Sequence, residues 1–579
     1  MLCRVVGFLG NNLLKQTFFL PQLTGRVCFL GQLPAYFPLE MPMYVPASAL
    51  RSLWLSPQFW LRLVLISIVS PKTAGSAEER LWLDMARASI TNNELLGHAN
   101  VLADDMFEGR EAGSRGGHAA AKYILQSLKE AELQPAGSNG RFTQPFSVAA
   151  AQNSQNLLAL LPGTDPILRD EYILIGAHYD HVGYGTRRNS FGPWGYIHNG
   201  ADDNASGVAA LLEVVDALTR TEYEPRRTIV FAFWDGEEKG LLGSKHWVGS
   251  PTLPFQNLKL ALNIDMVGRL REGRIEVGGT RSGKGLRCLM SSSRMVDSTW
   301  LDFTWEFKEN SDHWTFYEAK IPSMYVHTGV HDDYHRPSDD VENLNIDGIR
   351  MVSQYLIERI CGLADADQLP VFRKEAHFDT PQLQIRQERP LPPLASRLGF
   401  EWEHHPQISD FVRIKKISRH SAAIAVGLRR GDRIVAVNGV PCTESLILPN
   451  LALQSDSAIT LEIERSGTDM PLSITLPLQG KPIQLGLSWR EDPAEPQSVY
   501  LTRVVPYSPA DRAGLKLKDR ILGLSGQPIT SQDDLFGRIQ NMLTSGVQEI
   551  LFEVESRGTV RYVLVPLGLP TDIPADATL

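Results

Sequence analysis

Residues 171–180 read Glu-Tyr-Ile-Leu-Ile-Gly-Ala-His-Tyr-Asp, and this stretch decides the fold. Its first seven residues are mostly apolar, as in a short buried strand, and His178 follows at the carboxyl end. Residues 228–234 and 260–264 are two further apolar runs, each followed by acidic residues. Between the first two runs, residues 208–218 carry apolar side chains at helical spacing. Strands that alternate with helices predict a mixed, mostly parallel α/β sheet with flanking helices.

The polar residues near the ends of these runs are of the types that bind zinc. In open α/β sheets the loops at the carboxyl ends of the strands converge, and ligands bind there. Imidazole nitrogen and carboxylate oxygen are what zinc binds when no thiolate is offered. Five candidates fall in separate segments: His178, Asp203, Glu238, Asp265 and His335. They can hold two zinc ions if one carboxylate bridges the pair, and such a pair activates water against an amide bond.

The adjacent glutamates Glu237 and Glu238 fit this chemistry. One carboxylate can bind the metal while the other takes a proton from water. Taken alone, the pair is equally consistent with an exposed acidic turn, and His178 with a hydrogen-bonded core histidine. The agreement of five segments in order and type favours the metal site.

Together these segments resemble the M28 family of zinc peptidases, which includes the co-catalytic aminopeptidases, over roughly residues 85–365. The resemblance implies a zinc exopeptidase fold. It also implies that His178 and Asp265 bind the first of two Zn²⁺ ions. Glu238 and His335 would bind the second, and Asp203 would bridge the two.

The same resemblance implies three catalytic roles. Glu237 aligns with the general base, and Asp180 with the carboxylate that orients His178. Tyr334, directly before a ligand, matches a tyrosine that stabilises the oxyanion in some members of the family. A packed aromatic residue is the alternative for Tyr334.

Other polar residues near these motifs are expected to have structural roles. Rim or core positions are expected for His181, His198 and His327. Asp202 is expected to cap the ligand loop, and Asp312 and His313 to support the site without binding metal.

Beyond residue 395 the chain repeats itself. Leu-Gly-Phe-Glu-Trp at residues 398–402 recurs as Leu-Gly-Leu-Ser-Trp at residues 485–489, and later motifs keep the same offset. Both units resemble PDZ domains, in which this loop offers backbone N–H groups to a peptide carboxylate and the peptide adds to the sheet edge. Arg397 and Gln484 stand where a second glycine is usual, so a docking role is the alternative.

The expected organisation has six parts. They are an N-terminal extension with a signal peptide (1–77), the M28 peptidase domain (78–371), a linker (372–394), PDZ domains at 395–478 and 479–568, and a tail (569–579). Residues 63–69 are the apolar core of the signal, followed by small residues. The chain is therefore expected to be exported, to the periplasm, the cell envelope or the medium, without a transmembrane helix in its mature form. A membrane anchor or an apolar extension is the alternative.

Charge and cysteine spacing argue against nucleic-acid binding, a disulfide framework and a thiolate metal site. The formal net charge of −9 argues against binding nucleic acid, whose phosphates would be repelled. The three cysteines after residue 77 lie in different segments, which predicts neither a disulfide framework nor a thiolate metal site.

The sequence thus predicts an exported di-zinc exopeptidase, best matched by an aminopeptidase, with PDZ modules that bind peptide or dock. A carboxypeptidase or a glutaminyl-cyclase-like enzyme on the same scaffold is an alternative, although a cyclase retains one working zinc. A non-catalytic PDZ binding protein is another, but no ligand or base is lost.

Overall fold

The computed structural model describes residues 77–149, 152–295, 298–405, 408–444 and 446–567. The predicted signal peptide core and the tail at 569–579 lie outside the described residues. In the part of the chain that is described, no helix is both long enough and apolar enough to cross a membrane.

The first domain is built on a nine-stranded mixed sheet in the order β1-β3-β5-β4-β6-β9-β7-β8, with β2 paired to β3. Its strands are β1 (Gln134–Pro135), β2 (Thr143–Ala149), β3 (Gln152–Leu161), β4 (Tyr172–His178), β5 (Thr228–Trp234), β6 (Leu258–Ile264), β7 (Arg274–Gly278), β8 (Trp300–Thr304) and β9 (Ser323–His327). The central strands β5, β4, β6 and β9 run parallel. This confirms the predicted α/β class and the parallel centre of the sheet.

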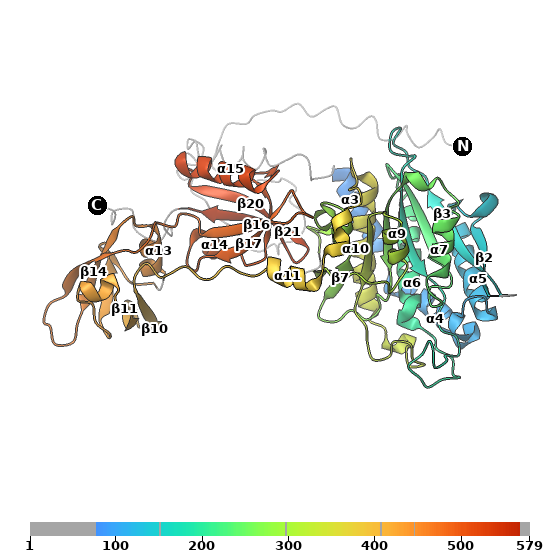
Figure 1. Ribbon diagram of the computed structural model, residues 1–579, viewed down its shortest axis with the longest axis horizontal. Helices are drawn as coiled ribbons and strands as arrows, with labels where there is room; N and C mark the ends of the chain where they lie inside the picture. Colours follow the sequence, from blue (N-terminus) through green and yellow to red (C-terminus); the bar gives the residue numbers. More distant parts are fainter. Residues whose placement is uncertain (1–76, 150–151, 296–297, 406–407, 445, 568–579) are drawn as a thin grey trace, which may run out of the picture. The chain divides into compact units, whose positions relative to one another are not determined.

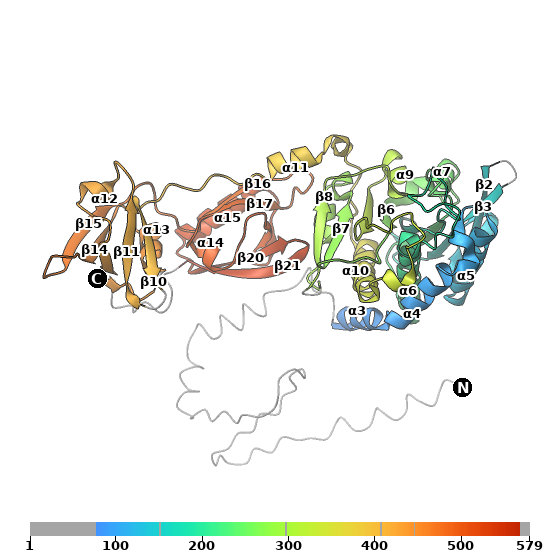
Figure 2. The same cartoon turned by 90° about the horizontal axis from the view of Figure 1, so that it is seen from below.

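Helices cover both faces of this sheet. They are α3 (Ala77–Ser89), α4 (Asn92–Leu102), α5 (Arg115–Glu130), α6 (Gly207–Arg220), α7 (Leu242–Gly249), α8 (Leu286–Met290), α9 (His313–Glu318) and α10 (Ile346–Asp365). Figures 1 and 2 show α4, α5, α6 and α10 along one face and α7 and α9 along the other. Every residue of β4 is therefore buried, which explains its continuous apolar run.

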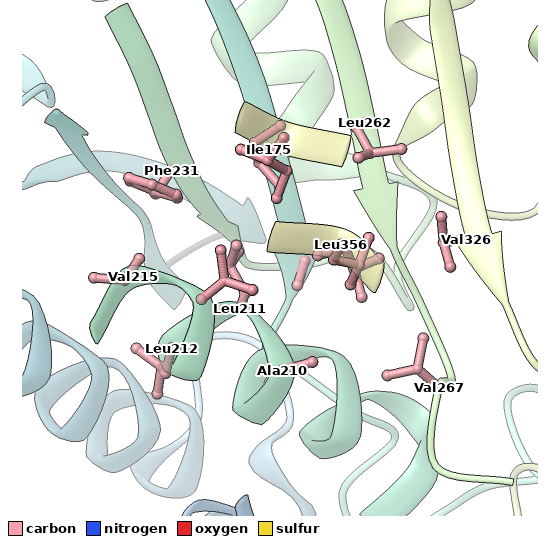
Figure 3. Close-up of a cluster of buried hydrophobic side chains, with 14 of the residues drawn as sticks. Ile175, Ala210, Leu211, Leu212, Val215, Phe231, Leu262, Val267, Val326 and Leu356 are labelled. Atoms are coloured by element: carbon pink, nitrogen blue, oxygen red, sulfur yellow. The ribbon is translucent and has the colours of Figure 1, made fainter. Parts of the chain in front are cut away.

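The larger core lies between the sheet and α6 and α10. Ile175 of β4 and Phe231 of β5 belong to the same buried cluster as Leu211 of α6 and Leu356 of α10 (Figure 3). All four side chains are fully buried. Each contributes about 1.5–3 kcal/mol through burial, and this packing fixes the positions of the strand ends that carry the site.

Two smaller sheets follow with the same strand order, which confirms the repeat. One is β10-β11-β12-β14-β15 with β13 on β12, and the other is β16-β17-β18-β20-β21 with β19 on β18. The strands of the first are β10 (Phe400–His405), β11 (Ile408–Ile417), β12 (Arg433–Val437), β13 (Val440–Pro441), β14 (Ala458–Glu464) and β15 (Leu472–Pro477). Those of the second are β16 (Leu487–Glu491), β17 (Val499–Val504), β18 (Arg520–Leu524), β19 (Gln527–Pro528), β20 (Glu549–Ser556) and β21 (Thr559–Pro566). Their helices are α12 (Ala422–Ala425) and α13 (Ile447–Gln454), then α14 (Pro509–Arg512) and α15 (Gln532–Thr544).

The predicted linker contains regular structure and is anchored by charge. It forms a 3₁₀ turn, η7 (Lys374–Phe378), and helix α11 (Pro381–Gln387). Between them, Asp379 accepts hydrogen bonds from Arg281 (2.7 Å) and Arg373 (2.6 Å). This part of the segment is thus tied to the first domain rather than free.

The second repeat contacts the first domain through buried ion pairs. Arg281 donates to both oxygens of Asp492, at 2.7 and 2.9 Å, and Arg287 donates to both oxygens of Glu555, at 2.9 and 3.1 Å. Asp492 also accepts a hydrogen bond from Arg520 at 2.9 Å. The charges of Arg520 and Arg281 outweigh the opposing effect of burial and lower the pKa of Asp492 to about 2.

Candidate metal centre

Five sequence segments bring their polar residues to the carboxyl edge of the central strands. His178 is the last residue of β4, Asp265 directly follows β6, and Glu238 lies four residues after β5. Asp203 belongs to η3 (Ala201–Ser206), the irregular turn before α6, and His335 lies in the loop after β9. Three of these elements are adjacent parallel strands, so their ends meet because of the sheet order.

The donor atoms form two neighbouring groups. In the first, His178 Nε2 lies 3.3 Å from Asp265 Oδ1 and 3.4 Å from Asp203 Oδ1. In the second, His335 Nε2 lies 3.0 Å from Asp203 Oδ2 and 3.2 Å from Glu238 Oε2. Asp203 therefore presents one carboxylate oxygen to each group, which is the arrangement of a bridging ligand.

The donor set fits zinc in chemistry and in spacing. It consists of imidazole nitrogens and carboxylate oxygens, and donor atoms about 3.3 Å apart are what two bonds of about 2.0 Å at a tetrahedral angle produce. Donor atoms of Glu237, His178 and Asp265 lie within 4.8 Å of one another, and so do those of His181, Asp203, Glu238 and His335. These side chains are buried or partly buried, and their carboxylates outnumber their histidines, so a cation would complete the balance of charge.

The electrostatics of the cluster follow from this crowding. Burial raises the pKa of Glu237, and the neighbouring Glu238 adds to the effect. For His335, burial works the other way, but the charges of Glu238 and Asp203 raise its pKa to about 11. Histidine and carboxylate thus compensate each other wherever they are paired, whereas Glu237 forms no ion pair within the described residues.

Asp180 supports the site through the backbone of the two glutamates. Its carboxylate accepts hydrogen bonds from the N–H groups of Glu237 (3.0 Å) and Glu238 (3.3 Å). His178 Nδ1 lies 3.7 Å from this carboxylate and 3.2 Å from the Asp180 carbonyl oxygen. The sequence predicts that Asp180 orients His178, and the structure adds that it fixes the turn carrying Glu237 and Glu238.

Tyr334 lies against His335, the residue that follows it in the sequence. Its ring stacks on that of His335 at a centroid distance of 3.9 Å. Burial raises its pKa, and the carboxylates of Asp203 and Glu238 act in the same direction. The phenol is therefore protonated at neutral pH and is able to donate a hydrogen bond.

Two residues outside the predicted site, Arg110 and Asp339, hold the loop of Asp203. Arg110 is buried and donates to the carbonyl oxygens of Tyr179 (2.9 Å) and Gly200 (2.9 Å). Asp339 accepts the N–H groups of Asp202 (2.9 Å) and Asp203 (3.0 Å). Arg110 belongs to the Glu-Gly-Arg segment 108–110, which was the available signal, whereas nothing near Asp339 marks it.

Some of the surrounding polar residues hold loops near the cluster, and one of them contacts a residue of the cluster itself. Asp202 accepts from Ser206 Oγ at 2.9 Å and from Gly268 N at 2.5 Å, the loop-capping role that was expected. His313 Nε2 donates to the Lys308 carbonyl oxygen at 3.0 Å, and the His313 carbonyl oxygen accepts from Ser323 Oγ at 2.6 Å. His181 is buried, in agreement with the core position expected for it, and its Nδ1 also lies 2.8 Å from Glu238 Oε1.

A buried, paired cluster of imidazoles and carboxylates at the open edge of an α/β sheet defines a metal-dependent hydrolase class. Comparison with known families gives the finer grouping. Residues 156–360 match the model of "Peptidase family M28", and residues 391–463 and 473–555 match that of the "PDZ domain". The chain thus carries an M28 peptidase region followed by two PDZ regions.

Several curated proteins are similar to parts of the chain. Leupeptin-inactivating enzyme 1 of Streptomyces exfoliatus is 30% identical over 179 residues, which cover 31% of this chain and 36% of that protein. Leucine aminopeptidase 1 of Grosmannia clavigera is 27% identical over 297 residues, covering 48% and 69%. The probable lipoprotein aminopeptidase LpqL of Mycobacterium tuberculosis is 27% identical over 249 residues, covering 40% and 46%. The chain therefore spans about a third of the length of the first of these relatives.

Solved structures also align with the chain. The LapA aminopeptidase of Legionella pneumophila is 19% identical with a TM-score of 0.41, covering 52% of this chain and 80% of that one. A glutaminyl cyclase of Porphyromonas gingivalis is 17% identical with a TM-score of 0.39, covering 47% and 98%.

Proposed function

We propose that this protein is an exported zinc aminopeptidase with two zinc ions, whose PDZ regions bind or position peptides. The observation that carries the proposal is the position of Asp203, which presents Oδ1 to His178 at 3.4 Å and Oδ2 to His335 at 3.0 Å. A site for one metal has no need of a carboxylate shared in this way. The names of the curated relatives support release of N-terminal residues over the carboxypeptidase and cyclase alternatives.

In the proposed assignment, His178 and Asp265 hold the first zinc, Glu238 and His335 hold the second, and Asp203 bridges. Bound zinc supplies Lewis-acid activation of water and of the scissile carbonyl group. These five residues make one buried unit, so that each metal site depends on the shared carboxylate.

Glu237 is the proposed general base. It accepts a proton from the attacking water and passes it to the departing amine. Its position is fixed because its backbone N–H donates to Asp180 at 3.0 Å. Tyr334 is proposed to donate a hydrogen bond to the oxyanion as the carbonyl carbon becomes tetrahedral.

The PDZ regions are proposed to bind peptide by strand addition. In each sheet the strand after the Leu-Gly loop, β10 or β16, lies at the edge. In the first repeat, Arg397 is buried, and its guanidinium donates to the carbonyl oxygens of Ala452 (2.7 Å) and Leu453 (2.9 Å). This arginine is committed to the fold, so backbone pairing rather than a charge on Arg397 would hold the ligand.

Export is proposed from the sequence of residues 63–77 alone, and the name of the lipoprotein relative is consistent with a location in the cell envelope. The N-terminal sequence of the mature protein would test it.

The activity is tested with Glu237→Gln in the full chain. The variant is expected to keep two zinc equivalents, because Glu237 is not a proposed ligand, and to lose about 10²–10⁴-fold in kcat on aminoacyl substrates. Turnover close to that of the unaltered protein in a fully zinc-loaded variant would refute the assignment. An N-blocked version of the same substrate serves as control, since an aminopeptidase does not cleave it.

A further inference from the structure

We propose that His181 is a positioning residue for the second metal site, where it holds Glu238 in the orientation that leaves one oxygen for the metal. The inference rests on the proposed two-zinc function. It concerns a residue that lies outside the five ligands assigned above.

The geometry divides the two oxygens of Glu238 between two partners. Oε2 faces His335 Nε2 at 3.2 Å and belongs to the metal-binding group. Oε1 faces His181 Nδ1 at 2.8 Å, a hydrogen-bond distance, while the same Nδ1 is 3.7 Å from Asp203 Oδ2. Since Nδ1 faces carboxylate oxygens only, it is the nitrogen that carries the proton.

The imidazole of His181 is held rigidly in this place. The side chain is fully buried, and its ring meets that of His335 edge-on at 5.5 Å. Its backbone N–H donates to the carbonyl oxygen of Arg110 at 3.2 Å. A buried side chain fixed at both ends has little freedom, so the carboxylate that it contacts is fixed as well.

The neighbouring loop is shaped to leave room for this ring. Gly200 begins the turn that carries Asp203, and its φ of +57° is in the left-handed region. A Cβ atom at Gly200 would lie 2.5 Å from His181 Cδ2. The loop of the bridging residue and the ring of His181 therefore fit together only with glycine at this position.

Loss of the His181 contact would leave Glu238 Oε1 buried without its donor. The carboxylate would then be free to turn, and an ordered ligand would become a mobile one. Residues that hold metal ligands in this way typically contribute 10–100-fold to metal affinity. The effect is expected at the second site and not at the first, because the His181 imidazole contacts Glu238 at 2.8 Å, and no ion pair joins it to His178 or Asp265 in the described part of the chain.

The test uses zinc binding by the full chain, measured by competition with a chromophoric chelator. His181→Ala is expected to weaken the second zinc equivalent by 10–100-fold and to leave the first unchanged. His181→Asn, whose side-chain amide can still donate to Glu238, is expected to recover most of that affinity. His246→Ala is the matched control, because His246 of α7 stacks on Phe146 of β2, and within the described residues no ion pair joins it to the proposed ligands. Thermal unfolding of each zinc-loaded variant reports whether it is folded.

Cobalt substitution separates positioning from direct ligation. If His181 positions Glu238, the visible absorption spectrum of the cobalt-loaded His181→Asn variant matches that of the unaltered protein. A changed spectrum, with affinity as low in the Asn variant as in the Ala variant, would show that His181 is itself a ligand and overturn the proposal. Unchanged affinity in His181→Ala would also overturn it. Fewer than two zinc ions on the unaltered protein would instead refute the proposed function.

Discussion

The two PDZ regions contain the same ion pair in opposite surroundings, and this predicts unequal effects of one substitution. In the first repeat, Arg433 on β12 pairs with Glu464 on β14 at 2.9 Å, and the side chains are 43% and 46% exposed. In the second, the corresponding Arg520 faces Glu555 at 3.9 Å, with exposures of 4% and 1%. Glu555 is buried because it also receives Arg287 of the peptidase region at 2.9 Å.

The magnitudes follow from burial. Glu555→Gln keeps the shape of the side chain but removes the carboxylate that pairs with Arg287 and leaves the buried Arg520 with Asp492 alone, a change that costs about 3–5 kcal/mol. Glu464→Gln breaks a pair that water already screens, at a cost of about 0–1 kcal/mol. The expected difference of roughly 3 kcal/mol corresponds to about a hundredfold change in the unfolding equilibrium.

The assay is urea unfolding of the full chain, followed by tryptophan fluorescence. Although burial opposes ionisation, Arg287 and Arg520 lower the pKa of Glu555. The stabilisation is therefore present at pH above the unfolded value of about 4.3 and is lost as the pH falls through the folded pKa. The gap between the two variants should close in strong acid. A Glu555→Gln variant no less stable than Glu464→Gln at pH 7 would refute the reasoning.

Two further substitutions test the peptidase region. Tyr334→Phe should lower kcat by about 10²-fold with both zinc ions retained, because it removes one donor to the oxyanion; an unchanged kcat would leave Tyr334 a packing residue. Arg110→Ala should destabilise the protein by about 3–5 kcal/mol and weaken zinc binding, because the carbonyl groups of Tyr179 and Gly200 lose their buried donor. Calorimetry and zinc titration measure these effects, and an Arg110→Ala protein with unaltered stability would contradict them.

The sequence was sufficient to predict three central strands of the sheet and the proposed ligands, because both leave local signals. A strand buried on both faces is mostly apolar, as β4 and β5 are. A ligand must follow such a strand closely, as His178 and Asp265 do. Neither inference requires knowledge of which distant segments of the chain pack against the strand.

The supporting residues could not be predicted because their partners are set by the paths of loops. His181 meets Glu238 across 57 positions of sequence, and Asp339 meets Asp203 across 136. No periodicity marks either residue, and a histidine beside a motif is more often a rim or core residue. Only the fold shows that these two side chains face the cluster.

The exposure of equivalent residues in the two PDZ regions also could not be predicted from the sequence. Arg433 and Arg520 occupy equivalent strands, β12 and β18, and each faces a glutamate on the next strand of its sheet. The Arg433–Glu464 pair is exposed, whereas the Arg520–Glu555 pair is covered by the peptidase region. The sequence around the two pairs does not distinguish them. In the second PDZ region, Asp492 pairs with Arg281 and Glu555 pairs with Arg287, both from the peptidase region. Because a buried carboxylate without its arginine is costly, these pairs make the second PDZ region depend on the peptidase region for its stability, while the first PDZ region contains no such requirement at the equivalent pair.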